Sequence, residues 1–275
     1  MDEDIRPNQQ RSITNGDVMI SVTEYGDANR PAVILLHGIS NRSEAWLPII
    51  PALAEPFRVL AMDLRGHGRS GHPVAGYRHS DYASDLQAVI ADYNLADPLI
   101  VGHSLGGIVA LDWAVEHPDV AAAIVAEDVP LSSGPGAEAT FATWISMNQM
   151  PFEALLARYR ADMPHRSEQQ VRRRAEAMAG TASAVFHEEL AAARSGATGD
   201  QTARLAGITS PVLLIHGDVE TGGMVPPDDV RRFAETVPNG RTARIAPGTH
   251  WLHHDRPEDF LRLVVPFLEQ HAPAR

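Results

Sequence analysis

The stretch that decides the fold reads Leu99-Ile-Val-Gly-His-Ser-Leu-Gly-Gly107. Its first three residues form an apolar run typical of a buried strand, and Leu105–His117 has the pattern of a helix. Between them lies Gly-x-Ser-x-Gly, in which a serine on a tight strand-to-helix turn is held above the sheet. The glycines leave room for neighbouring backbone, and the following helix N-terminus directs partial positive charge at developing negative charge. Ser104 is therefore the candidate nucleophile.

The rest of the chain alternates between short apolar runs and helical patterns, which predicts a mostly parallel, eight-stranded sheet with helices on both faces. We expect the first ten residues to be a disordered tail and Asn15-Gly16 to be a hairpin turn. The expected strands are 11–14, 17–24, 32–37, 58–62, 99–101, 122–126, 212–215 and 242–246. The expected helices are one capped by Ser80, 105–117, 226–237 and 257–270.

One block breaks this alternation. From Leu131 to about Leu205 there are helical patterns and no convincing strand. The block is rich in aromatic and methionine side chains, which suit an apolar, adaptable pocket but also simply pack helices together. We expect a helical insertion that folds over the sheet, with Trp144, Met147, Met150 and, outside the block, Trp251 as candidate substrate contacts.

Composition excludes several classes of function. The formal net charge is −12, which does not suit nucleic acid as a partner. All 23 basic residues are arginines and there is no cysteine, so lysine Schiff bases, thiol nucleophiles and disulfides are excluded. No cofactor motif is present, and no run approaches the ~18 apolar residues of a membrane span. The expectation is a soluble, cytoplasmic protein without cofactor that acts on a small molecule, as a monomer or homodimer.

The serine needs a base and an oxyanion hole. His250 follows the last expected strand, so it can reach over the carboxyl edge of the sheet where Ser104 would lie. The amides of Ile39 and Leu105 would hold the oxyanion. We expect His37 to be structural. His250, His253 and His254 mimic metal-ligand spacing, but they lack a matching carboxylate or cysteine set, so no metal site is expected.

These segments together resemble the α/β-hydrolase superfamily over nearly the whole chain. The matching pieces are Leu35-Leu-His-Gly38, Asp63-Leu-Arg-Gly-His-Gly-Arg-Ser70, Val101-Gly-His-Ser-Leu-Gly-Gly107 and Gly248-Thr-His250. The resemblance implies a Ser–His–acid triad, a core domain formed by residues 1–130 and 206–275, and a helical cap at 131–205. It also implies the order nucleophile, acid, histidine along the chain.

Three carboxylates are candidates for the acid of the triad. Glu220 has the spacing that the superfamily usually gives the acid after the seventh strand, and Asp218 lies two residues before it. Asp128 ends the sixth strand, 24 positions after Ser104, which is where some relatives of the haloalkane dehalogenase and lactonase groups take their acid. Geometry, and not position in the chain, decides such a triad. Glu220 is the first choice at this point.

A serine nucleophile narrows the reaction. Relatives that open epoxides or haloalkanes need an aspartate, because their intermediate is an alkyl ester. Ser104 favours hydrolysis of a carboxylic ester or lactone of a small, largely apolar substrate. Alternatives are C–C bond hydrolysis, perhydrolysis and a slow-turnover ligand receptor. The basic run Arg172-Arg-Arg174 could bind an anion, but a solvated helix face is the simpler interpretation.

Overall fold

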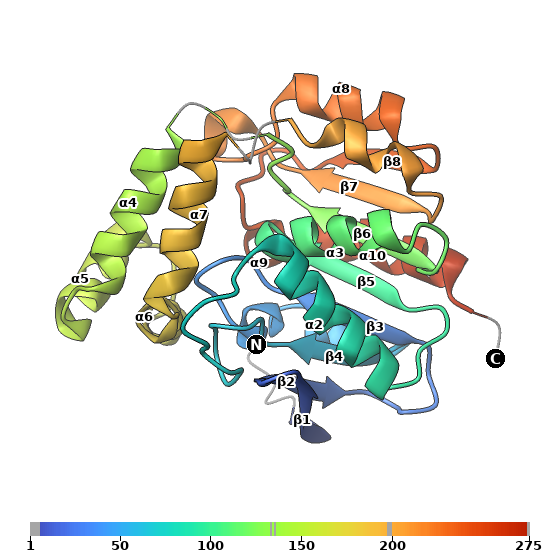
Figure 1. The fold of residues 1–275 in the computed structure, drawn as a ribbon, viewed down its shortest axis with the longest axis horizontal. Coiled ribbons are helices and arrows are strands. Elements are labelled where there is room, and N and C mark those ends of the chain that lie inside the picture. Colours follow the sequence, from blue (N-terminus) through green and yellow to red (C-terminus); the bar gives the residue numbers. More distant parts are fainter. Residues whose placement is uncertain (1–5, 133, 135, 197–199, 274–275) are drawn as a thin grey trace.

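The computed structural model describes residues 6–132, 134, 136–196 and 200–273 of the chain. Its centre is an eight-stranded sheet with the order β1-β2-β4-β3-β5-β6-β7-β8 (Figure 1). The pairs β1–β2 and β2–β4 are antiparallel and the other five pairs are parallel. The predicted fold class, a mostly parallel sheet between helices, is confirmed. The strands are β1 (Gln9–Asn15), β2 (Val18–Tyr25), β3 (Ala32–Leu36), β4 (Arg58–Met62), β5 (Leu99–His103), β6 (Ala123–Glu127), β7 (Val212–His216) and β8 (Gly240–Arg244).

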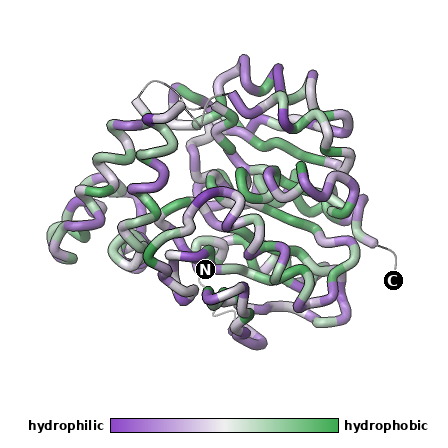
Figure 2. Tube along the Cα trace, in the orientation of Figure 1, coloured by the Kyte–Doolittle hydropathy of each residue, from purple (hydrophilic) through white to green (hydrophobic). Residues whose placement is uncertain are grey.

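Helices cover both faces of the sheet because its central strands are apolar on both sides. Along β3, Ile34 and Leu36 belong to one buried cluster, whereas Val33 and Leu35 belong to another. The first cluster packs under α2 (His79–Asp92), α3 (Leu105–Glu116) and α8 (Pro227–Thr236), and the second under α1 (Ile50–Leu53) and α10 (Pro257–His271). The hydropathy tube shows the same apolar strands at the centre and polar helix faces outside (Figure 2).

The predicted helical insertion is present between β6 and β7. It contains α4 (Ala137–Asn148), α5 (Phe152–Asp162), α6 (Glu168–Gly180), α7 (Ser183–Ser195) and the 3-10 helix η2 (Thr202–Gly207). Helices α4 to α7, called the cap below, lie beyond the carboxyl ends of the parallel strands (Figure 1). In the described part of the chain, no helix is both long and apolar enough to span a membrane.

Four local predictions were wrong. Ser80 lies inside α2, whose N-cap is Arg78, and the Arg78 N–H donates to Asp81. The hairpin turn is shifted by one residue, because Asn15 pairs with Val18 across it. The last strand, β8, begins and ends two residues earlier than expected. The predicted tail is partly ordered: β1 begins at Gln9, and residues 1–5 lie outside the described residues.

Candidate active site

Ser104 lies on the tight turn between β5 and α3. Its backbone has φ 50° and ψ −118°, a conformation that an L-residue rarely adopts. The flanking glycines are required by packing. A Cβ on Gly102 would lie 2.4 Å from the Gly106 carbonyl oxygen, and a Cβ on Gly106 would lie 2.1 Å from that of Leu36. The turn thus forces the serine side chain out at the end of the strand, under strain that the surrounding packing sustains.

Asp128 is the carboxylate that contacts His250. It lies just after β6, fully buried, with φ 44°. His250 Nδ1–H donates to Asp128 Oδ2 at 2.7 Å, and the N–H groups of Gly217 and Met224 donate to the same carboxylate at 3.0 and 2.7 Å. These donors hold the carboxylate in one orientation. Because Nδ1 carries the proton, His250 Nε2 is left to accept one.

The other two candidate acids lie elsewhere. Asp218 bonds the Arg244 guanidinium through Oδ1 and accepts the Gly248 N–H at 3.2 Å. The guanidinium of Arg244 holds the pKa of Asp218 below its ordinary value, so this carboxylate braces the loop before His250. Glu220 lies exposed in the short 3-10 turn η3 (Val219–Thr221), with no recorded contact to His250. The first choice for the acid, Glu220, is therefore not the residue that the structure brings to the histidine.

The segment after β3 approaches the serine closely. A Cβ on Gly38 would lie 3.2 Å from Ser104 Cβ and 2.7 Å from His103 Nδ1, so only glycine fits here. Ile39 follows at once, and Leu105 is the first residue of α3, where N–H groups have no intrahelical acceptor. The two expected oxyanion donors are therefore the chain neighbours of Gly38 and Ser104, two residues that lie close together.

Two buried histidines brace the Gly38–Asn41 turn. His37 Nε2 accepts the Leu64 N–H at 3.0 Å, and His67 Nε2 accepts the Ser40 N–H at 3.1 Å. Burial lowers the pKa of His37 to about 4 and that of His67 to about 3, so both rings stay neutral and can accept. The expectation that His37 is structural agrees with these contacts. The role of His67, in the Arg-Gly-His-Gly loop, was not predicted.

His103, the residue before the serine, links it to the histidine loop. Its Nε2–H donates to the His250 carbonyl oxygen at 2.8 Å, and the two imidazole centroids are 4.6 Å apart. Burial holds the pKa of His103 well below its ordinary value, so the ring is neutral. Ser104 and His250 are thereby brought to the same edge of the sheet. In the structure Ser104 Oγ and His250 share no recorded hydrogen bond, a bond that often tightens only with substrate bound.

A second buried carboxylate lies behind the nucleophile. Glu127 is fully buried and accepts hydrogen bonds from His253 N and Nδ1, both at 2.8 Å, while its carbonyl accepts the Ser104 N–H at 3.0 Å. Burial raises the pKa of Glu127 to about 7 and lowers that of His253 to about 3. His254, in turn, bonds Arg166. The three clustered histidines thus have three different partners.

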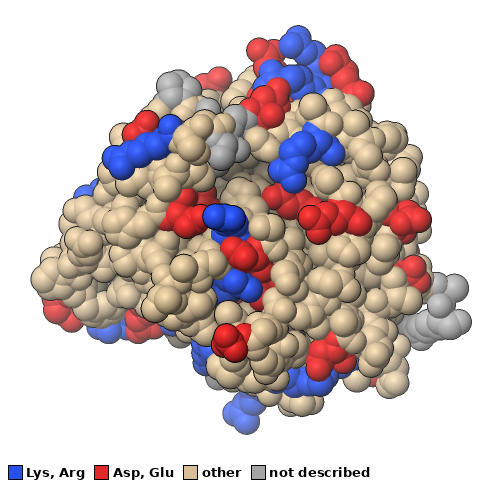
Figure 3. Space-filling model, viewed as in Figure 1, with Lys and Arg blue, Asp and Glu red and all other residues tan. Residues whose placement is uncertain are grey.

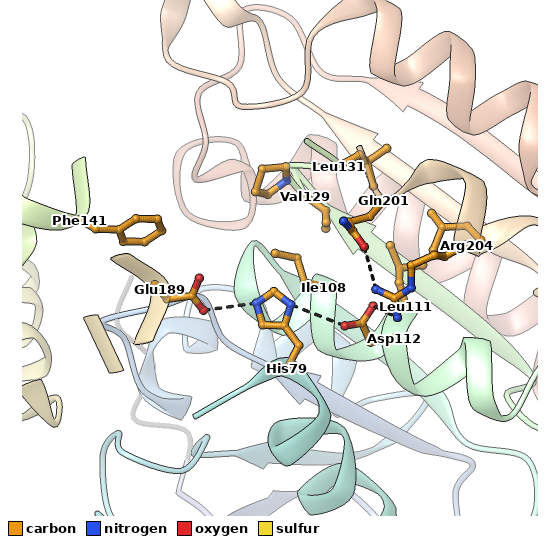
Figure 4. A pocket seen from close by; sticks show the side chains of 12 residues that line it. His79, Ile108, Leu111, Asp112, Val129, Leu131, Phe141, Glu189, Gln201 and Arg204 are labelled. Carbon is orange, nitrogen blue, oxygen red and sulfur yellow. Dashed lines mark hydrogen bonds and ion pairs between the residues drawn. The ribbon is translucent and has the colours of Figure 1, made fainter. Parts of the chain in front are cut away.

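Two cavities flank this edge. The first has a volume of about 140 Å³, and its apolar lining includes Ile108, Val129 and the cap residue Phe141. Its polar lining includes His79, which lies between Asp112 and Glu189 (Figure 4). The second, about 680 Å³, lies between the cap, the loop after β3 and the segment around His250, and Trp251 lines it. Acidic and basic side chains alternate where the cap meets the core (Figure 3).

The predicted substrate contacts divide between these places. Met147 is buried in the core cluster, and Trp144 and Met150 pack partly buried against it. Trp144 lies edge-on to Phe141 and Phe186 within the cap. None of the three lines either cavity described above. Of the four predicted contacts, Trp251 alone lines one of these two cavities, while the block residues Phe141 and Met163 line one cavity each.

Comparison with known proteins decides the family. The model of the alpha/beta hydrolase family matches residues 33–263. The chain belongs to this family. It is 26% identical over 267 residues to 2-(acetamidomethylene)succinate hydrolase of Mesorhizobium japonicum, covering 94% of this chain and 95% of that protein.

A second relative and a solved structure extend the comparison for this alpha/beta hydrolase. It is 27% identical over 257 residues to the sn-1-specific diacylglycerol lipase ABHD11 of Mus musculus, covering 88% of this chain and 82% of the lipase. The crystal structure of E-2-(acetamidomethylene)succinate hydrolase superposes with a TM-score of 0.81 at 24% identity, over 95% of this chain and 99% of the other, which shows a shared fold. The protein is therefore a hydrolase.

Proposed function

We propose that the protein is a serine hydrolase that cleaves a carboxylic ester or lactone, with Ser104 as nucleophile, His250 as base and Asp128 as the acid that orients it. The observation that carries the proposal is the 2.7 Å hydrogen bond from His250 Nδ1 to a fully buried Asp128 beside the strained Ser104 turn. That bond fixes the tautomer in which Nε2 is the basic nitrogen.

The reaction then runs through an acyl-enzyme. His250 Nε2 takes the Ser104 proton as Oγ attacks the carbonyl carbon, and the amides of Ile39 and Leu105 hold the oxyanion. As the C–O bond breaks, the leaving alkoxide takes that proton from His250. Water attacks the acyl-enzyme in the second half, with His250 again as base, and releases the acid and free Ser104. Asp128 stabilises the imidazolium in both halves.

The activities for which the two relatives are named are compatible with this chemistry. One is a lipase acting on diacylglycerol, an ester, and the other is a hydrolase of 2-(acetamidomethylene)succinate. Both names describe hydrolysis, which supports acyl transfer to water over a ligand receptor. The side chain of Ser104 argues against the alkyl-ester route of epoxide and haloalkane hydrolysis, which needs a carboxylate nucleophile.

Release of p-nitrophenol from p-nitrophenyl butyrate tests the proposal. We expect steady turnover by the intact protein and loss of turnover in Ser104→Ala and His250→Gln, with the fold checked by circular dichroism. A burst of one equivalent without turnover would favour a receptor. Turnover that survives both substitutions would contradict the proposal.

A further inference from the structure

The three consecutive arginines of α6 are not equivalent in the structure. Arg172 is exposed and its guanidinium lies 5.7 Å from the Phe152 ring centroid, outside the larger cavity. Arg173 and Arg174 are half-buried and both line that cavity of about 680 Å³. The expectation of a uniformly solvated basic face therefore holds for Arg172 and fails for its two neighbours.

Every carboxylate lining this cavity is already paired with another arginine. Glu44 bonds Arg42, Asp162 bonds Arg158 and Asp255 bonds Arg166. These pairs leave Arg173 and Arg174 as the uncompensated cations of the cavity. In the described part of the chain, Arg173 has no recorded hydrogen bond or ion pair. Two unbalanced charges in one cavity are notable in a protein whose net charge is −12.

Arg174 also retains an unused donor. Its two terminal nitrogens donate to Ser40 O and Ser40 Oγ at 2.6 and 2.8 Å, both neutral acceptors. Its Nε is buried and has no hydrogen-bond partner. A buried guanidinium N–H without an acceptor is unfavourable and calls for an explanation, which a bound anion supplies.

The cavity adjoins the machinery proposed above. Thr249 and Trp251, which flank His250, line it, and so does Asn41, whose N–H bonds Gly38 O across the oxyanion turn. The Arg174 guanidinium lies 5.4 Å from the Trp251 ring centroid and bonds Ser40, the residue after Ile39. A ligand in this cavity thus lies between the segments that carry the base and an oxyanion donor.

We propose that Arg173 and Arg174 bind a carboxylate group of the substrate, so that the enzyme selects an anionic ester or lactone over a neutral one. This inference rests on the proposed function and names its substrate class. The planar guanidinium matches a carboxylate in geometry and charge, and the half-buried setting screens the attraction less than open solvent would.

A pair of esters of matched length tests this selectivity. We expect kcat/KM for mono-p-nitrophenyl succinate to exceed that for p-nitrophenyl butyrate on the order of ten- to hundredfold, the range of charged hydrogen bonds. Arg173→Gln and Arg174→Gln should each lower this ratio about tenfold or more. Arg172→Gln, from the same helix but outside the cavity, should leave the ratio at the wild-type value. A general loss of catalysis lowers both kcat/KM values equally and therefore leaves their ratio unchanged.

The outcomes separate this inference from the proposed function. Ser104-dependent hydrolysis of the butyrate with no preference for the succinate, or an unchanged ratio in both variants, would overturn the anion site and leave the hydrolase standing. Calorimetric titration of glutarate into Ser104→Ala gives a readout that needs no turnover. We expect binding that Arg173→Gln abolishes and Arg172→Gln preserves; no heat of binding would contradict the site.

Discussion

His103 Nε2–H donates a hydrogen bond of 2.8 Å to the backbone carbonyl of His250, across 147 positions of the chain. The residue beside the nucleophile thus anchors the loop that carries the base. Removing this donor leaves a partly buried carbonyl without its partner, which costs about 1 kcal/mol.

We therefore predict that His103→Phe lowers kcat several-fold with little change in KM. The substitution displaces the base His250 but does not affect substrate binding. His103→Gln can still offer an N–H and should recover most of kcat. Steady-state kinetics on p-nitrophenyl butyrate measure both. If the Phe and Gln variants were equally impaired, the bond to His250 would not be the reason.

The three candidate acids should separate by kinetics and stability. Asp128→Asn removes the charge that fixes the His250 tautomer, so kcat should fall by about 10³–10⁴. Glu220→Gln alters an exposed side chain and should leave kcat within about twofold. Asp218→Asn breaks the contacts to Arg244 and Gly248, so it should lower the melting temperature more than the chemical step. A large kcat loss in Glu220→Gln with an active Asp128→Asn would reverse the assignment.

The backbone strain at Ser104 should lower the free energy of unfolding. At φ 50° and ψ −118° a glycine is unstrained, whereas alanine keeps the Cβ penalty. Ser104→Gly should therefore unfold at a higher urea concentration than Ser104→Ala. We expect its free energy of unfolding to be about 1 kcal/mol larger, a value that already includes the greater chain entropy of unfolded glycine. Urea unfolding of the two inactive variants makes the comparison without any substrate. A less stable glycine variant would show that the turn carries no strain.

His79 predicts a dependence of stability on pH. It lies 3.3 Å from Glu189 of α7 and 3.6 Å from Asp112 of α3, and Arg204 also pairs with Asp112 (Figure 4). Burial alone would lower the pKa of His79, but Asp112 and Glu189 outweigh it and raise the pKa to about 9. A raised pKa means that the charged form stabilises the folded state.

This stabilisation, on the order of 3 kcal/mol, should be complete below pH ~6.5 and lost as the pH rises through about 9. The measurement is the free energy of urea unfolding from pH 6 to 10 for the wild type and His79→Gln. The difference between them should shrink toward high pH. His187→Gln, which changes an exposed histidine of α7, the helix that carries Glu189, serves as the control. If the difference in unfolding free energy between the wild type and His79→Gln did not change with pH, the ion pairs of His79 with Asp112 and Glu189 would not be its cause.

The sequence predicted what depends on local pattern. Apolar runs located the parallel strands, and the Gly-x-Ser-x-Gly turn located Ser104, because both follow from residues adjacent in the chain. The identity of the acid could not be predicted in this way. Asp128 is positioned by its own backbone turn and by the Gly217 and Met224 amides, which come from a loop about 90 positions away. Spacing after β7 pointed to Glu220, but that loop directs Glu220 outward.

The arginines of α6 show the same limit. Their identity was plain in the sequence, yet which of them faces the cavity depends on how the helix is rotated against the core. That rotation is set by buried residues such as Val171 and Ala175, whose tertiary partners a helical pattern cannot name. The bracing role of His67 and the anchoring role of His103 were missed for the same reason: both act on backbone atoms of distant segments.

The most direct test of the account is the site of covalent labelling by a fluorophosphonate, read by peptide mass mapping. The account predicts a single adduct on Ser104, formed far more slowly in His250→Gln and in Asp128→Asn but at the wild-type rate in Glu220→Gln. An adduct on another residue, or labelling of Ser104 at an unchanged rate without His250, would contradict the claim that this imidazole activates this serine.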